Sequence, residues 1–196
     1  MRLLSSLALL LLVGCAGAPE PRPAALPAFV VDALQAPTAR KAKLYVAADG
    51  TVSKAVAYVE RAAIPDWVHT MADEQLGAGE DTEYEVEQYA DGTQTYEVTR
   101  TVNGLKAELS VTADRKLNYT ERALADDAVP EPIKAAVAGL DGMQVARIEH
   151  KKGPSIDQFE VVARKGEAEM RLVFAPDGKP VSTARRLPAV VQIEGR

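Results

Sequence analysis

The sequence predicts an α+β fold: two tandem repeats of a helix plus a four-stranded antiparallel sheet, with an extra N-terminal β-hairpin. Three observations predict it. Apolar–proline pairs, Ile64-Pro65 and Val129-Pro130, stand 65 residues apart at the start of helical patterns. Alternating polar and apolar residues follow each pair, as expected of strands. Further motifs recur 63 to 65 residues apart, which indicates a duplicated supersecondary unit.

The first residues are typical of a bacterial lipoprotein signal. Residues 3–13 are apolar apart from two serines. This is too short for a membrane-spanning helix, which takes about 20 residues, but it suits a secretory signal. Leu12-Val13-Gly14-Cys15 resembles a lipobox, so we expect residues 1–14 to be removed and a lipid to be attached at Cys15. The alternative is a chance cysteine behind an ordinary signal peptide.

The lipobox resemblance also implies where the protein resides. It implies a diacylglycerol and an N-acyl chain on Cys15, enough for stable attachment to a membrane of the bacterial cell envelope. Ala16 follows in place of the aspartate that retains such proteins in the inner membrane, which favours the outer membrane, facing the periplasm, in a Gram-negative source. Residues 15–28 are rich in proline and alanine and predict an extended tether.

Residues 29–63 are interpreted as a partial repeat. The segment from Lys41 to Asp49 aligns with Lys106 to Asp114, 65 residues later. Residues 43–47 and 51–59 predict a hairpin, and residues 29–35 the remnant of a helix. An isolated hairpin is marginally stable in water, so we expect this one to add strands to the sheet of the first full repeat.

Residues 64–128 and 129–190 are the two expected full repeats. Each begins with a helix that has proline in its first turn, followed by Asp66 or Glu131, an acidic residue that suits the positive end of a helix. The first repeat then predicts strands around residues 83–88, 95–102, 105–112 and 116–123. The second predicts strands at residues 144–150, 158–164, 168–174 and 180–186.

These motifs together resemble the PepSY-like family, which is itself described as similar to the β-lactamase-inhibitor protein. The resemblance rests on the apolar–proline pairs, on Tyr96-Glu97-Val98 with its counterpart Phe159-Glu160-Val161, and on the turn Asp177-Gly178-Lys179. The first repeat departs from it with Asp114-Arg115-Lys116 at the corresponding turn. The inhibitor also has disulfides that a chain with one cysteine cannot form, so no inhibitory residue is carried over.

Composition and motifs argue against several function classes. A formal charge of −5 argues against a nucleic-acid binder that relies on a basic surface. His69 and His150 stand in no motif with a partner at a meaningful spacing, and we interpret both as exposed. The serines lack a nucleophile-elbow motif, and no phosphate-binding loop is present. We therefore expect no enzyme activity, no catalytic residue, no cofactor and no metal site.

The candidate partner-binding residues are Trp67, Glu83, Glu85 and Glu87. The three glutamates share one strand face, but their spacing of about 6.6 Å along the strand is too wide for one Ca²⁺. We therefore favour a solvated or partner-facing strand over a metal site.

Residues 64–128 carry 15 acidic and 5 basic side chains, against 9 acidic and 11 basic side chains in residues 129–196. This asymmetry fits a basic partner, although attraction between the repeats, or simple solubility, also explains it. Trp67 is either an interface anchor or half-buried packing.

From these observations we expect a non-catalytic envelope lipoprotein that acts as a binding module for a protein or peptide. The partner would be basic if the acidic surface makes the contact. The PepSY-like resemblance implies inhibition of a secreted hydrolase as one form of this function. The first alternative is a structural or assembly component of an envelope complex. The second, kept open by the acidic strand alone, is a lipoprotein that binds a small ligand or Ca²⁺.

Overall fold

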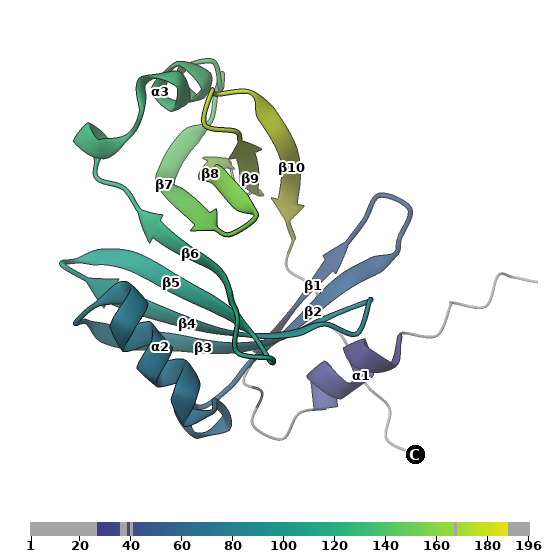
Figure 1. The fold of residues 1–196 in the computed structure, drawn as a ribbon. Helices are drawn as coiled ribbons and strands as arrows, with labels where there is room; N and C mark the ends of the chain where they lie inside the picture. Colours follow the sequence, from purple (N-terminus) through teal and green to yellow (C-terminus); the bar gives the residue numbers. More distant parts are fainter. Residues whose placement is uncertain (1–26, 36–38, 40, 167, 188–196) are drawn as a thin grey trace, which may run out of the picture.

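The main feature of the fold is one antiparallel sheet of ten strands. It is seen in a computed structural model that describes residues 27–35, 39, 41–166 and 168–187. Strand order in the sheet follows chain order from β1 to β10. The sheet curls into a half-barrel, with β1 and β10 facing each other across its open side (Figure 1).

Three short helices accompany the ten strands. The helices are α1 (Ala28–Gln35), α2 (Asp66–Leu76) and α3 (Glu131–Ala138), with 3-10 turns at Arg61–Ala63 and Asp126–Ala128. The strands are β1 (Lys41–Val46), β2 (Val52–Tyr58), β3 (Glu80–Tyr89), β4 (Gln94–Val102), β5 (Leu105–Thr112), β6 (Leu117–Ala123), β7 (Gln144–Gly153), β8 (Ile156–Lys165), β9 (Ala168–Phe174) and β10 (Pro180–Arg186). Among the described residues, no helix is both long enough and apolar enough to span a membrane.

The starts of helices α2 and α3 follow from the local sequence. Pro65 and Pro130 occupy the N-cap positions of α2 and α3, and Asp66 and Glu131 follow in the first turn, where a carboxylate interacts favourably with the helix dipole. Helix α2 ends at Gly77, whose φ of 83° lies in a region that side-chain-bearing residues rarely adopt.

The prediction of two helix-plus-four-stranded-sheet repeats is wrong. Strand β6 pairs with β7 through Thr120–Ala123 and Glu149–Lys152, so the strands of both expected repeats belong to one continuous sheet. The physical reason is that a unit of about 65 residues buries little surface alone and leaves strand edges that can pair with a neighbour. Most individual strands lie where expected, and β5, β9 and β10 have the predicted bounds.

The extra hairpin, β1–β2, joins the other end of the sheet by pairing with β3. It therefore extends the same sheet, as expected for a hairpin too small to be stable alone. The predicted signal peptide and the lipid-bearing Cys15 lie outside the described residues, as does almost all of the predicted tether.

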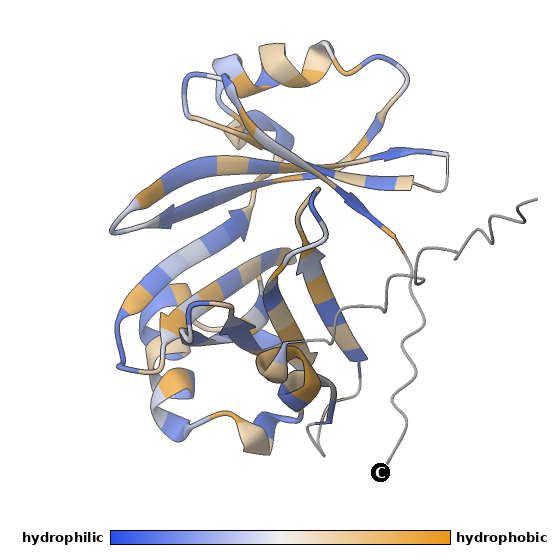
Figure 2. Ribbon diagram, turned by 90° about the vertical axis from the view of Figure 1, so that its right-hand side faces the viewer, coloured by the Kyte–Doolittle hydropathy of each residue, from blue (hydrophilic) through white to orange (hydrophobic). Residues whose placement is uncertain are grey.

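The two faces of the curled sheet differ in character. Hydropathy alternates along the strands, because successive side chains point to opposite faces (Figure 2). The outer face is apolar and is covered by the helices. One cluster there joins Val30 of α1 and Val68 of α2 to Leu109 of β5, and a second joins Ile133 of α3 to Phe159 of β8. The inner, concave face carries mainly charged side chains.

Candidate functional site

The candidate site is a charged hollow of 290 Å³ on the concave face of the half-barrel. Nine of the ten strands contribute to its walls, which contain eight cationic side chains, six glutamates and three tyrosines. These residues are Lys41, Lys43, Tyr45, Lys54, Tyr58, Glu83, Glu85, Glu87, Glu97, Lys106, Glu108, Tyr119, Glu121, Arg147, Lys151, Arg171 and Arg186. We refer to this site as the charged hollow.

Strand alternation and register assemble the charged hollow. Every second residue of β1 and of β3 points inward, which places the lysines of β1 and the glutamates of β3 on the same face. The register continues this polar surface across the sheet, since Glu85 of β3 is paired with Tyr58 of β2 and with Glu97 of β4. The sheet curls (Figure 1), so that side chains from nine of its strands line one hollow.

Three ion pairs join the N-terminal hairpin to β3. Lys41 lies 2.8 Å from Glu83, Lys43 lies 3.2 Å from Glu85, and Lys54 lies 2.5 Å from Glu87. The exposed fraction of the three glutamate side chains falls from 42% to 3% and 2% along this row. The expectation that Glu83, Glu85 and Glu87 share one face is confirmed, but Glu85 and Glu87 are buried, so a solvated strand is wrong for these two.

Glu87 has the most complete set of partners in this row. Its carboxylate accepts hydrogen bonds from the Thr95 hydroxyl at 2.8 Å and the Tyr89 hydroxyl at 2.9 Å, besides its ion pair with Lys54. Burial alone would raise the pKa of Glu87, but the Lys54 ammonium and these hydrogen bonds outweigh it and hold the pKa below its ordinary value. Glu87 is therefore ionised in the folded protein at neutral pH.

A second group of buried carboxylates lies deeper, at the junction of β5, β6 and β7. One oxygen each of Glu108, Glu121 and Glu149 lies within 4.8 Å of the others, a spacing that suits a metal ion. Lysine ammonium groups already supply positive charge here, because Lys106 contacts Glu108 and lies 3.2 Å from Glu149, and Lys151 lies 2.7 Å from Glu121. This arrangement does not favour a metal ion, so we assign none.

Two carboxyl groups in the charged hollow have raised pKa values. Burial is the main cause for Glu121, whose pKa is raised to about 7 although Lys151 acts in the opposite direction. Burial also raises the pKa of Glu97 well above its ordinary value, and the charges of Glu108, Glu85 and Glu87 add to the effect. Glu97 accepts a hydrogen bond of 2.7 Å from the Tyr119 hydroxyl. A protonated Glu97 relieves the repulsion among these neighbouring carboxylates.

Hydrogen-bonding capacity remains in the wall beside the charged hollow. Glu149 lies 3.0 Å from the Arg147 Nε, and Glu160 lies 3.1 Å from Arg171. Despite these ion pairs, both Glu149 carboxylate oxygens, one Glu160 oxygen and the Arg147 Nε have no aligned hydrogen-bond partner among the described residues. Buried polar groups usually satisfy their hydrogen bonds, and here the neighbouring cationic side chains supply the compensating charge instead.

The structure does not bring Trp67 together with the three glutamates. Trp67 lies on α2, on the outer face of the sheet, and its ring packs edge-on against Tyr96 at 5.8 Å. The Arg115 guanidinium lies over the same ring, 5.5 Å from its centre. Trp67 is therefore partly buried against the apolar cluster of the outer face, and the sheet separates it from the charged hollow.

The two histidines are not simple surface residues. The expectation of an exposed His69 is wrong, because α2 lies flat on the sheet and packs the ring edge-on against Tyr84, 5.5 Å away, leaving it 7% exposed. His150 is partly exposed, stacks on Phe159 at 4.4 Å, and places its Nε2 2.8 Å from Asp157. Neither histidine lines the charged hollow.

Sequence reasoning missed the basic half of the charged hollow. The available signal was the alternation of Lys41, Lys43 and Tyr45 next to Lys54 in the adjoining strand, which matches the alternation of the glutamates in β3. Arg147, Lys151 and Arg171 could not be assigned to the same surface without knowing that β6 pairs with β7. The site therefore depends on the continuity of the sheet.

Comparisons with known proteins give limited information. No family model matches this sequence, and no curated protein matches it. One similar solved structure is described as a DUF2874 family protein from Bacteroides uniformis ATCC 8492. It has a TM-score of 0.48 and 13% sequence identity, over 62% of this chain and 89% of that chain. The chain therefore has a structural neighbour among β-rich folds, and at this level of similarity the neighbour carries no argument about function.

Proposed function

We propose that this chain is a non-catalytic binding protein that holds a charged segment of a partner protein in the charged hollow. The observation that carries the proposal is the hollow itself, 290 Å³ in volume and lined by charged and tyrosine side chains. Most charged side chains of soluble proteins are exposed and mobile. Here ion pairs hold them in fixed positions, which lowers the entropic cost of binding a complementary surface.

In this proposal the exposed side chains at the rim of the charged hollow and the buried ion pairs at its floor have different roles. Rim side chains remain accessible, with 51% of Lys41, 42% of Glu83 and 54% of Arg186 exposed. Surface ion pairs are worth about 0–1 kcal/mol, so a partner can replace them at little cost. The floor pairs, such as Lys54–Glu87, are buried and stay intact. Specificity then comes from matching both signs of charge around the rim.

The composition of the charged hollow supports a binding role over catalysis. Its lining residues include no serine, cysteine or histidine. Nucleophilic catalysis needs such a group activated by an adjacent base. Burial raises the pKa of Glu97 and Glu121 while their contacts with Tyr119 and Lys151 act in the opposite direction, and none of these nucleophile types lies among the lining residues for either carboxyl to activate.

Envelope location and family membership form part of the same proposal. The lipobox-like Leu12-Val13-Gly14-Cys15 supports lipid attachment at Cys15, with the outer membrane of a Gram-negative cell as destination. The apolar–proline pairs and the Tyr96-Glu97-Val98 motif support membership of the PepSY-like family. Inhibition of a secreted hydrolase is the form of binding that this resemblance favours.

The test exchanges the two charges of one rim pair. The double variant Lys41→Glu/Glu83→Lys keeps an ion pair but reverses its direction, so the local field is inverted while the fold is preserved. The control is Glu131→Lys/Lys134→Glu, which exchanges the exposed 2.8 Å pair on α3, on the outer face. Both variants and the wild type, as soluble residues 24–196, are used to capture partners from an envelope extract of the source cells at low and high salt.

We expect one stoichiometric protein partner that binds the wild type and the α3 control, is released by salt, and is lost with the rim exchange. Equal capture by both exchanged variants would place the contact outside the charged hollow. Absence of any stoichiometric partner would argue against a binding module and favour the structural alternative.

A further inference from the structure

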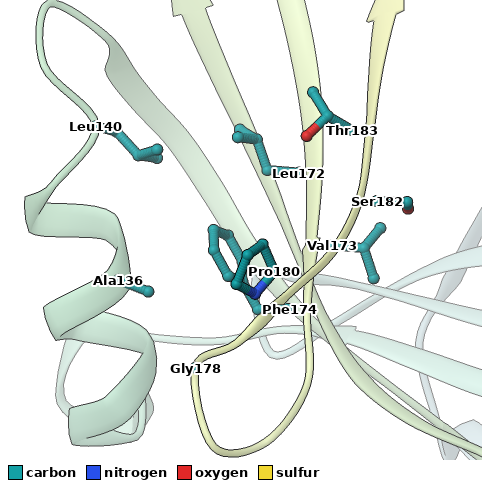
Figure 3. A pocket seen from close by; sticks show the side chains of 9 residues that line it. All are labelled: Ala136, Leu140, Leu172, Val173, Phe174, Gly178, Pro180, Ser182 and Thr183. Atoms are coloured by element: carbon teal, nitrogen blue, oxygen red, sulfur yellow. The ribbon is translucent and has the colours of Figure 1, made fainter.

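A second cavity lies on the outer face of the sheet, between α3 and the C-terminal hairpin. It has a volume of 330 Å³. Its walls are mainly apolar: Leu140 and Ala136 on the α3 side face Leu172, Phe174 and Pro180 on the sheet side (Figure 3). The other lining residues are Val173, Gly178, Ser182 and Thr183. We refer to this cavity as the apolar crevice.

The apolar crevice is bordered by an edge strand. Strand β10 contributes Pro180, Ser182 and Thr183 to the lining and pairs with β9 alone among the described strands. All seven of its residues are exposed. Every second residue of such a strand directs its N–H and C=O away from the sheet, so β10 offers about 23 Å of edge to which another strand can hydrogen-bond.

The two edges of the sheet are alike in several respects and differ in one. Strand β1 has an irregular register and exposes Val46 at 58%, and β10 has an irregular register after Pro180 and exposes Val181 at 59%. Of these two edges, β10 is the one that borders the apolar crevice, and Leu187 beyond it is 62% exposed. Exposed apolar residues beside an unpaired edge and an apolar cavity indicate an interaction surface.

Charge at this edge indicates the chemistry of the partner. Strand β10 contains Arg185 and Arg186 and no acidic residue, although the whole chain has a formal charge of −5. Arg186 pairs with Glu169 on the concave face. Arg185 lies on the other face, two residues beyond Thr183, and has no ion-pair partner among the described residues. An added strand would therefore meet first the apolar crevice and then an unpaired guanidinium on the same face.

We propose that β10 binds an extended peptide segment as an eleventh strand. An apolar side chain of the peptide, opposite Thr183, fills the apolar crevice. A carboxylate two residues away in the peptide, on the same face, pairs with Arg185. Because cross-strand neighbours point to the same side, these two contacts fix the register of the peptide. A second copy of β10 fits less well, since it has no carboxylate to offer.

The test uses a defined probe with soluble residues 24–196. The probe is a fluorescein-labelled nine-residue peptide of threonines with a central leucine and a glutamate two positions away on either side. This symmetry allows either strand direction. Binding is measured by fluorescence anisotropy, and a second peptide with lysines in place of the glutamates reports charge preference.

Two substitutions on α3 form a matched pair. Ala136→Phe places a ring in the apolar crevice, whereas Ala135→Phe adds the same ring at an exposed position of the same helix. We expect Ala136→Phe to weaken binding of the glutamate probe by at least about tenfold, the scale of one lost apolar side-chain contact. Ala135→Phe should leave binding unchanged. Thermal unfolding of both variants shows whether α3 remains folded.

Arg185→Glu provides a test that does not depend on the stability of α3, because the side chain is exposed and unpaired in the described structure. We expect this variant to bind the lysine probe more tightly than the glutamate probe, the reverse of the wild type. Absence of saturable binding, equal binding by the Ala136→Phe and Ala135→Phe variants, or an unchanged charge preference in the Arg185→Glu variant would each overturn the proposal. Binding that is lost in the Lys41→Glu/Glu83→Lys variant but kept in Ala136→Phe would also overturn it.

Discussion

Replacing Lys54 by methionine tests whether the buried ion pairs hold the half-barrel together. Methionine keeps the apolar stem of the lysine and removes the charge. Glu87 would then be a carboxylate 2% exposed with no opposing charge. Removal of one member of a buried pair costs about 3–5 kcal/mol. Because the hydroxyls of Thr95 and Tyr89 still donate to Glu87, we expect a loss near the lower end, about 3 kcal/mol at pH 7.

The pH dependence of this loss identifies its cause. In the wild type the pKa of Glu87 is below its ordinary value of 4.5, so its stabilising contribution is present above that pH and is lost as pH falls through the lower, folded-state pKa. Without Lys54, burial raises the pKa of Glu87 instead. The deficit of the Lys54→Met variant should therefore be largest at neutral pH and shrink as pH falls toward 4.5, where Glu87 becomes protonated.

The assay is urea unfolding of wild type, Lys54→Met, Glu87→Gln and the double variant at pH 7 and pH 5, followed by far-ultraviolet circular dichroism and by Trp67 fluorescence. The double variant should lie within about 1.5 kcal/mol of the wild type, since a neutral amide keeps the hydroxyl donors satisfied. A loss below about 1 kcal/mol for Lys54→Met at pH 7 would refute the reasoning. So would a deficit that stays constant with pH and is not relieved in the double variant.

Three further predictions concern other parts of the chain. The Glu121 carboxyl should titrate near pH 7 when followed by carbon NMR. Because this folded-state pKa is raised, the free energy of unfolding should increase as pH falls from 8 to 5. The Glu121→Gln variant should show a weaker dependence of the free energy of unfolding on pH. Gly153→Ala should destabilise the fold by more than about 2 kcal/mol in urea unfolding, because a Cβ there would lie on the Asn118 carbonyl oxygen. Gly166→Ala, which has open space around it but a φ of 60°, should cost about 1 kcal/mol from backbone strain alone. Intact mass should show acylation at Cys15, and Cys15→Ala should release the protein from membranes; an unmodified, soluble wild type would contradict the anchor.

The positions of single elements could be predicted from sequence because their signals are local. Alternation in Leu105–Thr112 and Ala168–Phe174 reports a strand within a few residues, and Pro65 and Pro130 mark helix starts. The arrangement of these elements is not local. Pairing of Thr120–Ala123 with Glu149–Lys152 requires the edges of β6 and β7 to meet, although α3 and its flanking loops separate the two strands in the sequence. No sequence pattern reports that these edges meet.

The candidate site was predictable only in part, for the same reason. That Glu83, Glu85 and Glu87 share a face follows from strand periodicity alone. Their burial does not, because a row of acidic residues on a strand is usually solvated, and here a curled sheet places lysines of the preceding hairpin against them. Trp67 illustrates the opposite case, since its helix packs on the apolar face and separates it from the acidic row.

The match between strand order and chain order has a consequence for how the protein folds. Each strand pairs with its immediate neighbour in the sequence, so the segments to be closed between strands are mostly short turns. Folding rates rise when native contacts are close in sequence, because little chain entropy is lost before a contact forms. The sheet can therefore grow one hairpin at a time from whichever end is available. The slowest steps should be the joining of β2 to β3 and of β6 to β7, the two pairings that must span a helix, α2 and α3 respectively.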